Sequence, residues 1–262
     1  MILSDKVIII SGVGPGLGQA MAHIAAQEQA KIVLAARNAA YLEAVREEIS
    51  AKGGTAIAVP CDVSDSAQCQ RLAEITRDHY GDQIHGLVNS AYYHGDWCFT
   101  ENADEQDWAK IYDVNCLGAL RLTKACLPAL KKGGAVVNVS TMASVLPYGT
   151  DYGMEMGYAV AKAGLNTLTK YMAADLGKHG IRVNTCRMGW IHGAPVEAYI
   201  QSAIANGRRQ EDIIKEITKN IPLGCIPPQD DCARMVLMLL SDYAAAVTGA
   251  TLDINGGQWM AP

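Results

Sequence analysis

Several features that define other protein classes are missing from this sequence. It contains one phenylalanine, and its eight cysteines stand far apart, with no CxxC pair and no spacing typical of metal ligands. No apolar stretch approaches the roughly 20 residues of a membrane-spanning helix. No run of lysine and arginine is long enough to follow a phosphate backbone. We therefore expect no metal site, no membrane partner and no nucleic-acid partner.

The sequence also shows no signal peptide and no linker between domains. The N-terminal residues lead straight into an apolar segment, with no basic region and no cleavage site. The 22 basic and 27 acidic side chains give a net charge of -5 and are spread along the chain. No linker rich in proline, glycine and serine interrupts the 262 residues, half of which are apolar. These observations predict a cytoplasmic protein with reduced cysteines, folded as one domain over residues 1–262.

What the chain does have is a regular alternation of short apolar runs and amphipathic segments. Val7 to Ser11 is a β-branched run closed by glycines, and the segment after it carries one apolar stripe at helical spacing. Strands that alternate with helices imply parallel pairing with right-handed crossovers. The fold class predicted is α/β, a single Rossmann-type, doubly wound parallel sheet with helices on both faces. The predicted strands are residues 7–11, 31–35, 55–59, 86–89, 135–140, 181–186 and 250–254.

One segment departs from this alternation. Residues 191–228 are less periodic and are rich in glycine and proline near both ends. We expect a mobile, partly helical excursion there that contributes to substrate binding.

A glycine-rich turn lies between the first predicted strand and the first predicted helix. Glycines at this position permit a tight turn and let backbone amides approach a pyrophosphate at the helix N-terminus. The G-x-G-x-x-G spacing is not met, because Leu17 stands where the third glycine would fall. A purely structural turn is the alternative, but the flanking strand and helix favour nucleotide binding. The residues predicted to contact the cofactor are Gly12, Gly14, Pro15, Gly16, Leu17 and Gly18.

The end of the second strand bears on the choice of cofactor. An acidic residue there would hydrogen-bond the ribose 2′-hydroxyl, whereas this chain has Arg37, whose guanidinium can pair with a 2′-phosphate. NADP(H) is therefore the preferred cofactor, with NAD(H) possible, and a solvated surface charge is the alternative role for Arg37. Asp62 and Val63 follow the third strand and are predicted to border the adenine, although Asp62 could instead cap the next helix.

Tyr158 and Lys162 lie four residues apart at the start of a predicted helix, so both side chains share one face. A tyrosine hydroxyl has a pKa near 10 in water, and a neighbouring ammonium favours the phenolate. We expect Lys162 to lower the pKa of Tyr158, which could then protonate a ketone oxygen. Alone, this spacing is more typical of an exposed helix face, so a catalytic role for the pair has to be judged from the rest of the sequence.

Motifs in several separate units of the chain together resemble the short-chain dehydrogenase/reductase family. They are the glycine turn, Asn89-Ser90-Ala91, Asn115, Asn138-Val139-Ser140-Thr141, the Tyr158/Lys162 pair, Ile181-Arg182-Val183-Asn184 and Asp253-Ile254-Asn255-Gly256-Gly257. The resemblance implies a tyrosine acid/base (Tyr158), a lysine that holds the nicotinamide ribose (Lys162), an asparagine that supports a proton-relay water (Asn115) and a hydroxyl that orients substrate. It also implies cofactor contacts from Asn89, Ala91, Gly189 and Ile191, and a homodimer or homotetramer.

The sequence departs from the family pattern around the expected site. The orienting hydroxyl usually comes second in a serine pair, which here reads Ser140-Thr141, so we assign Thr141 and keep Ser140 as a possible substitute. The segment from Tyr148 to Met156 is a few residues longer than usual. Tyr92 replaces a glycine and is expected to face the substrate. Gly193 stands in place of a threonine that contacts the nicotinamide, so backbone near Ile191 is expected to carry more of that contact.

Aromatic side chains are concentrated in the segments expected around the nicotinamide. They include Tyr92, Trp97, Tyr148, Tyr152, Trp190 and Tyr199. We interpret them as a large, mostly apolar pocket for a bulky cyclic, aromatic, terpenoid or steroid-like alcohol or ketone, with substrate contacts from Ser140, Thr141, Tyr92, Tyr152 and Trp190. Ordinary packing is the alternative. His94 and His192 are more typical of loop histidines than of catalysts.

Two other functions compete with an alcohol dehydrogenase or ketoreductase. A non-catalytic NADP(H)-binding sensor would keep the fold, but the complete set of Tyr158, Lys162 and Asn115 argues against it. By family resemblance, a dehalogenating enzyme without a nicotinamide would lack the lysine and fill the glycine turn with bulkier residues. Lys162 and Gly16 both oppose that hypothesis.

Overall fold

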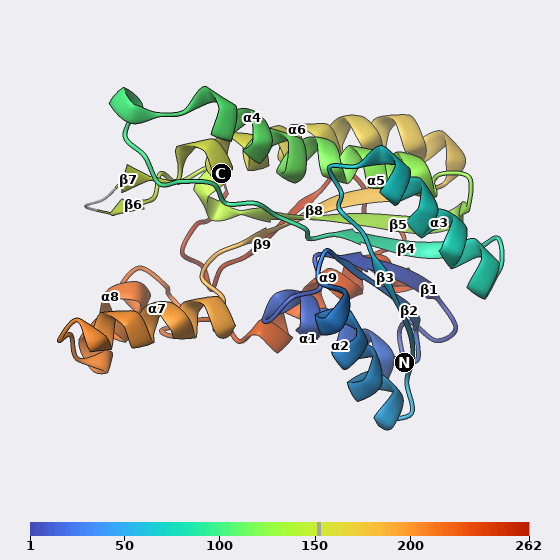
Figure 1. Cartoon of the computed structure of the whole chain (residues 1–262), viewed down its shortest axis with the longest axis horizontal. Coiled ribbons are helices and arrows are strands. Elements are labelled where there is room, and N and C mark those ends of the chain that lie inside the picture. The colour runs from blue at the N-terminus through green and yellow to red at the C-terminus, as the bar shows by residue number, and fades with distance from the viewer. Residues whose placement is uncertain (151–152, 262) are drawn as a thin grey trace.

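A seven-stranded parallel sheet forms the centre of the computed structural model, which describes residues 1–150 and 153–261 (Figure 1). The strand order is β3-β2-β1-β4-β5-β8-β9. The strands are β1 (Val7–Ser11), β2 (Lys31–Ala36), β3 (Thr55–Pro60), β4 (Ile84–Asn89), β5 (Leu130–Thr141), β8 (Arg182–Met188) and β9 (Thr251–Ile254). This arrangement confirms the predicted doubly wound sheet.

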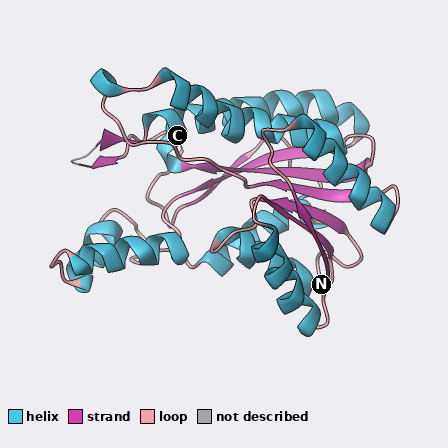
Figure 2. Ribbon diagram, viewed as in Figure 1, coloured by secondary structure: helices cyan, strands magenta, loops and turns pink. Residues whose placement is uncertain are grey.

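Helices cover both faces of the sheet (Figure 2). In Figure 1 one group lies below it and the other above it. The lower group is α1 (Leu17–Gln27), α2 (Ala39–Ala51) and α9 (Gln229–Leu240); the upper group is α3 (Ser66–Tyr80), α4 (Glu105–Tyr112), α5 (Gly118–Cys126) and α6 (Met156–Leu176). No helix among the described residues has the length and apolar character needed to cross a membrane.

Strand β1 is almost wholly apolar because both faces of the sheet are covered there. In β1, Ile8 and Ile10 pack into the core beneath α1 and α9, while Ile9 packs into the opposite core with α3 and α5. Successive side chains of a strand point to opposite faces, so such a strand shows no polar alternation. The continuous apolar runs in the sequence are therefore the signature of this sheet.

The sheet changes direction between β1 and β4. The chain runs outward from β1 through β2 to β3 and then returns to pair β4 with β1 on its other side. In open α/β sheets, ligands bind at the carboxyl ends of the strands beside such a switch point. The glycine turn follows β1 and the loop of residues 90–99 follows β4, so both lie at this place.

The expected excursion at 191–228 is partly helical, as predicted. It contains α7 (Ala194–Ala205) and α8 (Gln210–Thr218), which pack on each other through Ile200, Ile213 and Ile217. Both helices extend from the end of the sheet that also carries the hairpin of β6 (Gly149–Thr150) and β7 (Gly153–Met154) (Figure 1). Short 3-10 helices occur at Thr100–Asn102, Met142–Ser144, Gly177–His179 and Asp242–Ala244, and a π-helix at Asp113–Leu117.

A buried network of amides and hydroxyls connects β4, β5, β8 and α6. Asn89 Nδ2 donates to Asn138 Oδ1 at 2.9 Å, and Asn138 Nδ2 donates to Thr169 Oγ1 at 2.8 Å. Thr185 Oγ1 donates to the same Thr169 oxygen at 2.9 Å. Buried polar groups stabilise a structure only when they are paired, so each member of this network depends on the others.

Replacing Asn138 with alanine should therefore lower the free energy of unfolding by about 2 to 3 kcal/mol, because two buried hydrogen bonds are lost and their partners remain. Urea unfolding followed by circular dichroism measures this. Gln201→Ala removes an exposed bond to Glu197 and should change stability by less than about 0.5 kcal/mol. An equal loss in both variants would contradict the role of the network.

Candidate active site

The glycine turn approaches the loop after β4 too closely for any side chain. A Cβ atom on Gly12, where φ is +82°, would lie 2.4 Å from the backbone of Ser90 and Ala91. A Cβ on Gly18 would lie 2.3 Å from the Gly12 carbonyl oxygen. At Gly14, by contrast, no atom of the described residues lies within 4 Å of such a Cβ. The turn is therefore tightly packed at Gly12 and Gly18, and has free space at Gly14.

Helix α1 begins directly after this open part of the turn. Its N-cap is Gly16, and no side chain among the described residues caps it, so the first backbone amides depend on another acceptor. Gly14, Gly16 and Leu17 all line a cavity. Amides at a helix N-terminus that face a cavity suit an anionic group. The turn therefore fits the pyrophosphate of a dinucleotide.

The cavity has a volume of about 840 Å³ and runs from the glycine turn to α7. A ligand of dinucleotide or drug size needs a cavity of this order. Of the residues predicted from sequence, it is lined by Gly12, Gly14, Pro15, Gly16, Leu17, Gly18, Tyr92, Ser140, Thr141, Tyr158, Lys162, Gly189, Trp190 and Ile191. Many of the residues expected to bind cofactor and most of those expected to bind substrate thus border one space.

Tyr158 and Lys162 enter this cavity from the first turns of α6. Lys162 is 2% exposed, and its Nζ donates to the Val139 carbonyl oxygen at 2.8 Å. The same Nζ lies 5.7 Å from the centre of the Tyr158 ring. Burial lowers the pKa of Lys162 to about 8, so the amine is still mainly charged at neutral pH.

The predicted lowering of the Tyr158 pKa is wrong for this structure. Burial raises the pKa of the Tyr158 hydroxyl above its ordinary value, and the neighbouring Glu155 and Tyr92 act in the same direction. Removal of the phenolate from water is the largest cause of this shift. Tyr158 is therefore a neutral phenol at neutral pH, the form that can donate a proton.

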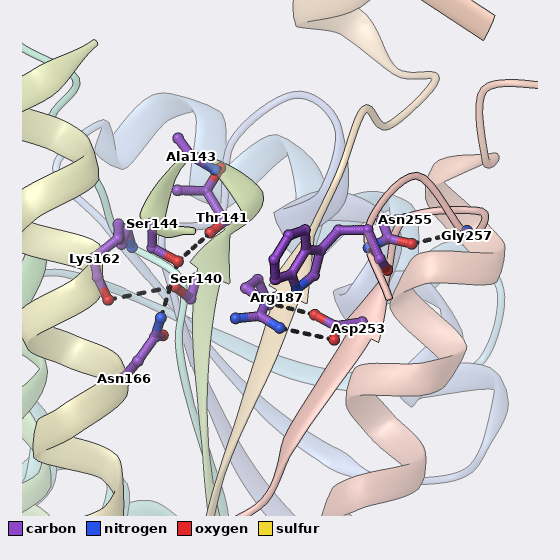
Figure 3. Close-up of polar contacts among 11 residues, drawn as sticks. Ser140, Thr141, Ala143, Ser144, Lys162, Asn166, Arg187, Asp253, Asn255 and Gly257 are labelled. Carbon is purple, nitrogen blue, oxygen red and sulfur yellow. Dashed lines mark hydrogen bonds and ion pairs between the residues drawn. The ribbon is translucent and has the colours of Figure 1, made fainter. Parts of the chain in front are cut away.

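Ser140 and Thr141 differ in what their hydroxyls already do (Figure 3). Ser140 is buried and its Oγ donates to the Lys162 carbonyl oxygen at 3.5 Å. Thr141 Oγ1 accepts from the Ala143 amide at 3.2 Å, which leaves its own proton for another acceptor. The turn that follows is held by Ser144, whose Oγ donates to the Thr141 carbonyl oxygen at 2.6 Å. This geometry favours Thr141 over Ser140 as the donor to a bound molecule.

Asn115 lies behind the cavity wall, not in it. It is buried in the π-helix, and its Nδ2 donates to the Tyr93 and Ile111 carbonyl oxygens at 2.6 and 2.9 Å. Its Oδ1 is buried with no protein partner among the described residues. A π-helix often occurs at a functional site. Here it lets Asn115 hold the loop after β4 and leaves one acceptor for a small donor such as water.

The structure does not bring every predicted cofactor residue to the cavity. Arg37, Asp62, Val63, Asn89 and Ala91 are outside its lining, and Asn89 instead donates into the buried amide network. A hydrogen bond from Ser64 lowers the pKa of Asp62, and the charge of Arg37 adds to this effect. Arg37 and Asp62 therefore lie near each other beyond the glycine turn. The alternative role for Asp62 as a helix cap is wrong, because Asp65 caps α3.

His94 and Glu155 form a hydrogen-bonded pair that the sequence interpretation missed. His94 Nε2 lies 3.0 Å from Glu155 Oε2, and the imidazole stacks on the Tyr158 ring with the ring centres 5.0 Å apart. The hydrogen bond with Glu155 raises the pKa of His94. Sixty-one positions separate the two residues, so no local spacing in the sequence indicates the pair.

A continuous series of aromatic contacts lines the far part of the cavity. Trp97 packs against Tyr148, Tyr148 against Trp190, and Trp190 against Tyr199, with ring centres 5.7 to 5.9 Å apart. We call these four residues the aromatic wall. Tyr92 packs against Tyr158 at 6.3 Å. The predicted substrate residue Tyr152 lies outside the described residues.

The hairpin of β6 and β7 supports this wall. Cys98 and Met154 form an antiparallel bridge, with amide-to-carbonyl distances of 3.2 and 2.9 Å. The extra residues of the segment after β5 are thus fastened to the loop after β4. Within the described residues, no group of three or more His, Cys, Asp or Glu side chains could hold a metal ion.

Known proteins similar to this chain are oxidoreductases. A family model described as enoyl-(acyl carrier protein) reductase matches residues 12–258. An uncharacterized oxidoreductase from Methylorubrum extorquens is 32% identical over 258 residues, which are 97% of this chain and 98% of the relative. A 2,5-dichloro-2,5-cyclohexadiene-1,4-diol dehydrogenase from Sphingobium indicum is 31% identical over 257 residues, 97% and 96% of the two chains. The structure of L-sorbose reductase from Gluconobacter frateurii, complexed with NADPH and L-sorbose, has a TM-score of 0.90 and 25% identity, covering 100% of this chain and 99% of that one.

The buried amine of Lys162 should lower the stability of the protein. A lysine pKa depressed to about 8 means that the unfolded state binds more protons between pH 8 and about 10.4, so stability rises with pH in that window. Lys162→Met should raise the free energy of unfolding by about 1 to 2 kcal/mol at pH 7, with the gain shrinking as pH approaches 10. Urea unfolding at several pH values measures the gain, and a gain that grows with pH would contradict the assignment.

Proposed function

Since the chain belongs to the short-chain dehydrogenase/reductase family of oxidoreductases, we propose that it interconverts a secondary alcohol and a ketone with a nicotinamide cofactor. The observation that carries the proposal is the meeting of Tyr158, Lys162 and Thr141 with the glycine turn around one cavity. The residues that would hold the cofactor are those of the turn, together with Lys162, Gly189 and Ile191. A bound nicotinamide would exchange the hydride with the substrate carbon.

The proposed proton chemistry belongs to Tyr158. In ketone reduction its neutral hydroxyl donates a proton to the substrate oxygen, and the raised pKa keeps that hydroxyl protonated at neutral pH. The ammonium of Lys162 then stabilises the phenolate that remains. Thr141 donates a hydrogen bond to the substrate oxygen and fixes its position. In alcohol oxidation the same groups act in reverse.

The proposed cofactor is NADP(H) in preference to NAD(H). Arg37 follows β2 beside the glycine turn, where a 2′-phosphate would approach, and a guanidinium can pair with it through two hydrogen bonds. Asp62 and Val63 would border the adenine on the neighbouring strand. The similar L-sorbose reductase was solved with NADPH, which agrees with this preference.

The proposed substrate is a bulky, mostly apolar cyclic, aromatic, terpenoid or steroid-like alcohol or ketone. The aromatic wall and Tyr92 present ring faces and edges to the cavity, which suit a flat or cyclic molecule. The similar diol dehydrogenase is named for a chlorinated cyclohexadiene, a compound of this class. By family likeness the proposal also takes the protein as a cytoplasmic homodimer or homotetramer.

The proposal is tested by following NADPH and NADH oxidation with purified protein over a panel of cyclic, aromatic and steroidal ketones. Turnover with any member supports a reductase. Tight NADPH binding without turnover would instead favour the alternative function, a non-catalytic NADP(H) sensor on the same fold. Absence of binding by both cofactors would overturn the proposal.

Tyr158→Phe should retain NADPH binding and lose about 10² to 10⁴-fold in turnover, because it removes the proton donor and keeps the ring. Stopped-flow turnover and NADPH titration measure the two properties separately. Tyr243→Phe changes an exposed tyrosine in the same way and should leave both unchanged. A near-normal rate in Tyr158→Phe would remove Tyr158 from the mechanism.

Arg37→Asp should reverse the cofactor preference, because a carboxylate repels a 2′-phosphate and accepts a bond from a 2′-hydroxyl. We expect the ratio of kcat/KM for NADPH over NADH to fall by at least about tenfold, the value of one good charge-assisted contact. Arg209→Asp, at an exposed arginine on the distant excursion, is the matched control. An unchanged ratio would make Arg37 a solvated charge.

A further inference from the structure

His94 occupies an unusual position between two aromatic rings. Its imidazole stacks on Tyr158 on one side, with ring centres 5.0 Å apart and planes 28° apart. On the other side it stacks on Trp97, with corresponding values of 5.2 Å and 24°. The residue therefore covers the ring of the proposed proton donor and links it to the aromatic wall.

Both nitrogens of His94 face acceptors. Nε2 lies 3.0 Å from Glu155 Oε2, and Nδ1 lies 3.2 Å from the Gly95 carbonyl oxygen. A carboxylate and a carbonyl oxygen can only accept, so both contacts are hydrogen bonds only when both ring nitrogens carry protons. The geometry thus selects the imidazolium. A cation between Tyr158 and Trp97 is favoured further by the ring faces.

The charges around Tyr158 show what this cation does. Glu155 is the N-cap residue of α6, three positions before Tyr158, and its side chain is only 13% exposed. Its negative charge opposes formation of a phenolate at Tyr158. Other titratable groups that interact with Tyr158, His94 or Glu155 are Lys162 on α6, Tyr92 on the same loop as His94, Tyr148 before β6, and Asp107 on α4, whose carboxylate accepts from the Tyr93 hydroxyl at 3.0 Å.

We propose that His94 is a positioning residue for the proton transfer at Tyr158: its imidazolium neutralises the Glu155 carboxylate and holds the phenol ring by stacking. This role rests on the proposed function and adds a second cation to the one that Lys162 provides. Lys162 Nζ lies 5.7 Å from the centre of the Tyr158 ring and donates to the Val139 carbonyl oxygen, whereas His94 stacks on the ring face. Together the two cations offset part of the cost of burying the phenolate.

The charge balance makes the role testable by rescue. His94→Phe keeps an aromatic ring in the stack but leaves Glu155 unpaired beside Tyr158, so phenolate formation becomes harder. The double variant His94→Phe/Glu155→Gln removes both charges and restores neutrality. A purely packing role for His94 predicts no change in the ionisation of Tyr158 in either variant.

The experiment measures kcat/KM for alcohol oxidation, which requires the phenolate form, as a function of pH. In His94→Phe the pH at half-maximal rate should move up by about one unit, a tenfold loss on the acidic side, since one unpaired nearby charge has an effect of this size. In the double variant at least half of the shift should be recovered. His23→Phe, at another His–Glu pair with a 2.9 Å contact, should leave the profile unchanged.

A second readout does not need turnover. The ultraviolet absorbance of tyrosinate, taken as the difference between each protein and the same protein carrying Tyr158→Phe, reports the ionisation of Tyr158 directly. If wild type turns over and neither readout shifts in His94→Phe, or if the shift persists undiminished in the double variant, the role of His94 is overturned while the function stands. If wild type shows no turnover with any cofactor, the proposed function fails and the catalytic role fails with it.

Discussion

Everything at the proposed site depends on the close approach of backbone to backbone between the turn after β1 and the loop after β4. Gly12 lies against Ser90 and Ala91 with no room for a Cβ atom, and Gly18 lies equally close to Gly12. This contact sets the position of α1 relative to the loop of residues 90–99. Tyr92, His94 and Trp97 on that loop are thereby placed opposite α6. A constraint made of glycines thus fixes both the proposed cofactor end and the proposed substrate end of the cavity.

Burial is the second determinant of the site, and it acts against stability. Lys162 is one of the largest fully buried side chains, and Tyr158 next to it is partly buried at the cavity wall. The fold therefore removes an amine, and in part a phenol, from water, and electrostatic effects between them are stronger there than in bulk solvent. The buried amide network joins Asn89 on β4 to Asn138 on β5, and the next residue of β5, Val139, accepts the hydrogen bond of Lys162. The network therefore lies next to the strand segment that holds the amine.

Much of the fold follows from the sequence, because buried parallel strands appear as uninterrupted apolar runs. The seven strands of the parallel sheet were predictable in this way, with each end within five residues of its place in the structure. Helix α9 was not assigned, although Cys232, Val236 and Leu240 repeat at helical spacing. The π-helix around Asn115 has no propensity signal, since it depends on packing. The hairpin of β6 and β7 was expected only as extra length.

The site divides in a similar way. The glycine turn and the Tyr158/Lys162 pair are short-range patterns, and the structure brings them together at the cavity. Asn89 does not reach the cavity, because its side chain binds Asn138 in a network that only the folded chain creates. The pKa of Tyr158 is raised and not lowered, because the spacing of charges in the sequence does not show burial. The pairing of His94 with Glu155 spans two loops and was invisible for the same reason.

The bridge between Cys98 and Met154 belongs to a part of the pocket that is distinct from the helix carrying Tyr158 and Lys162. Tyr158 and Lys162 lie on the long helix α6, which packs on the core. Trp97 and Tyr148 lie on two segments outside the core that are joined by this bridge. Lengthening or shortening the hairpin of β6 and β7 would change the shape of the cavity, while Tyr158 and Lys162 would stay in place. A change in this one short stretch of sequence would therefore alter the proposed substrate specificity and keep the proposed chemistry.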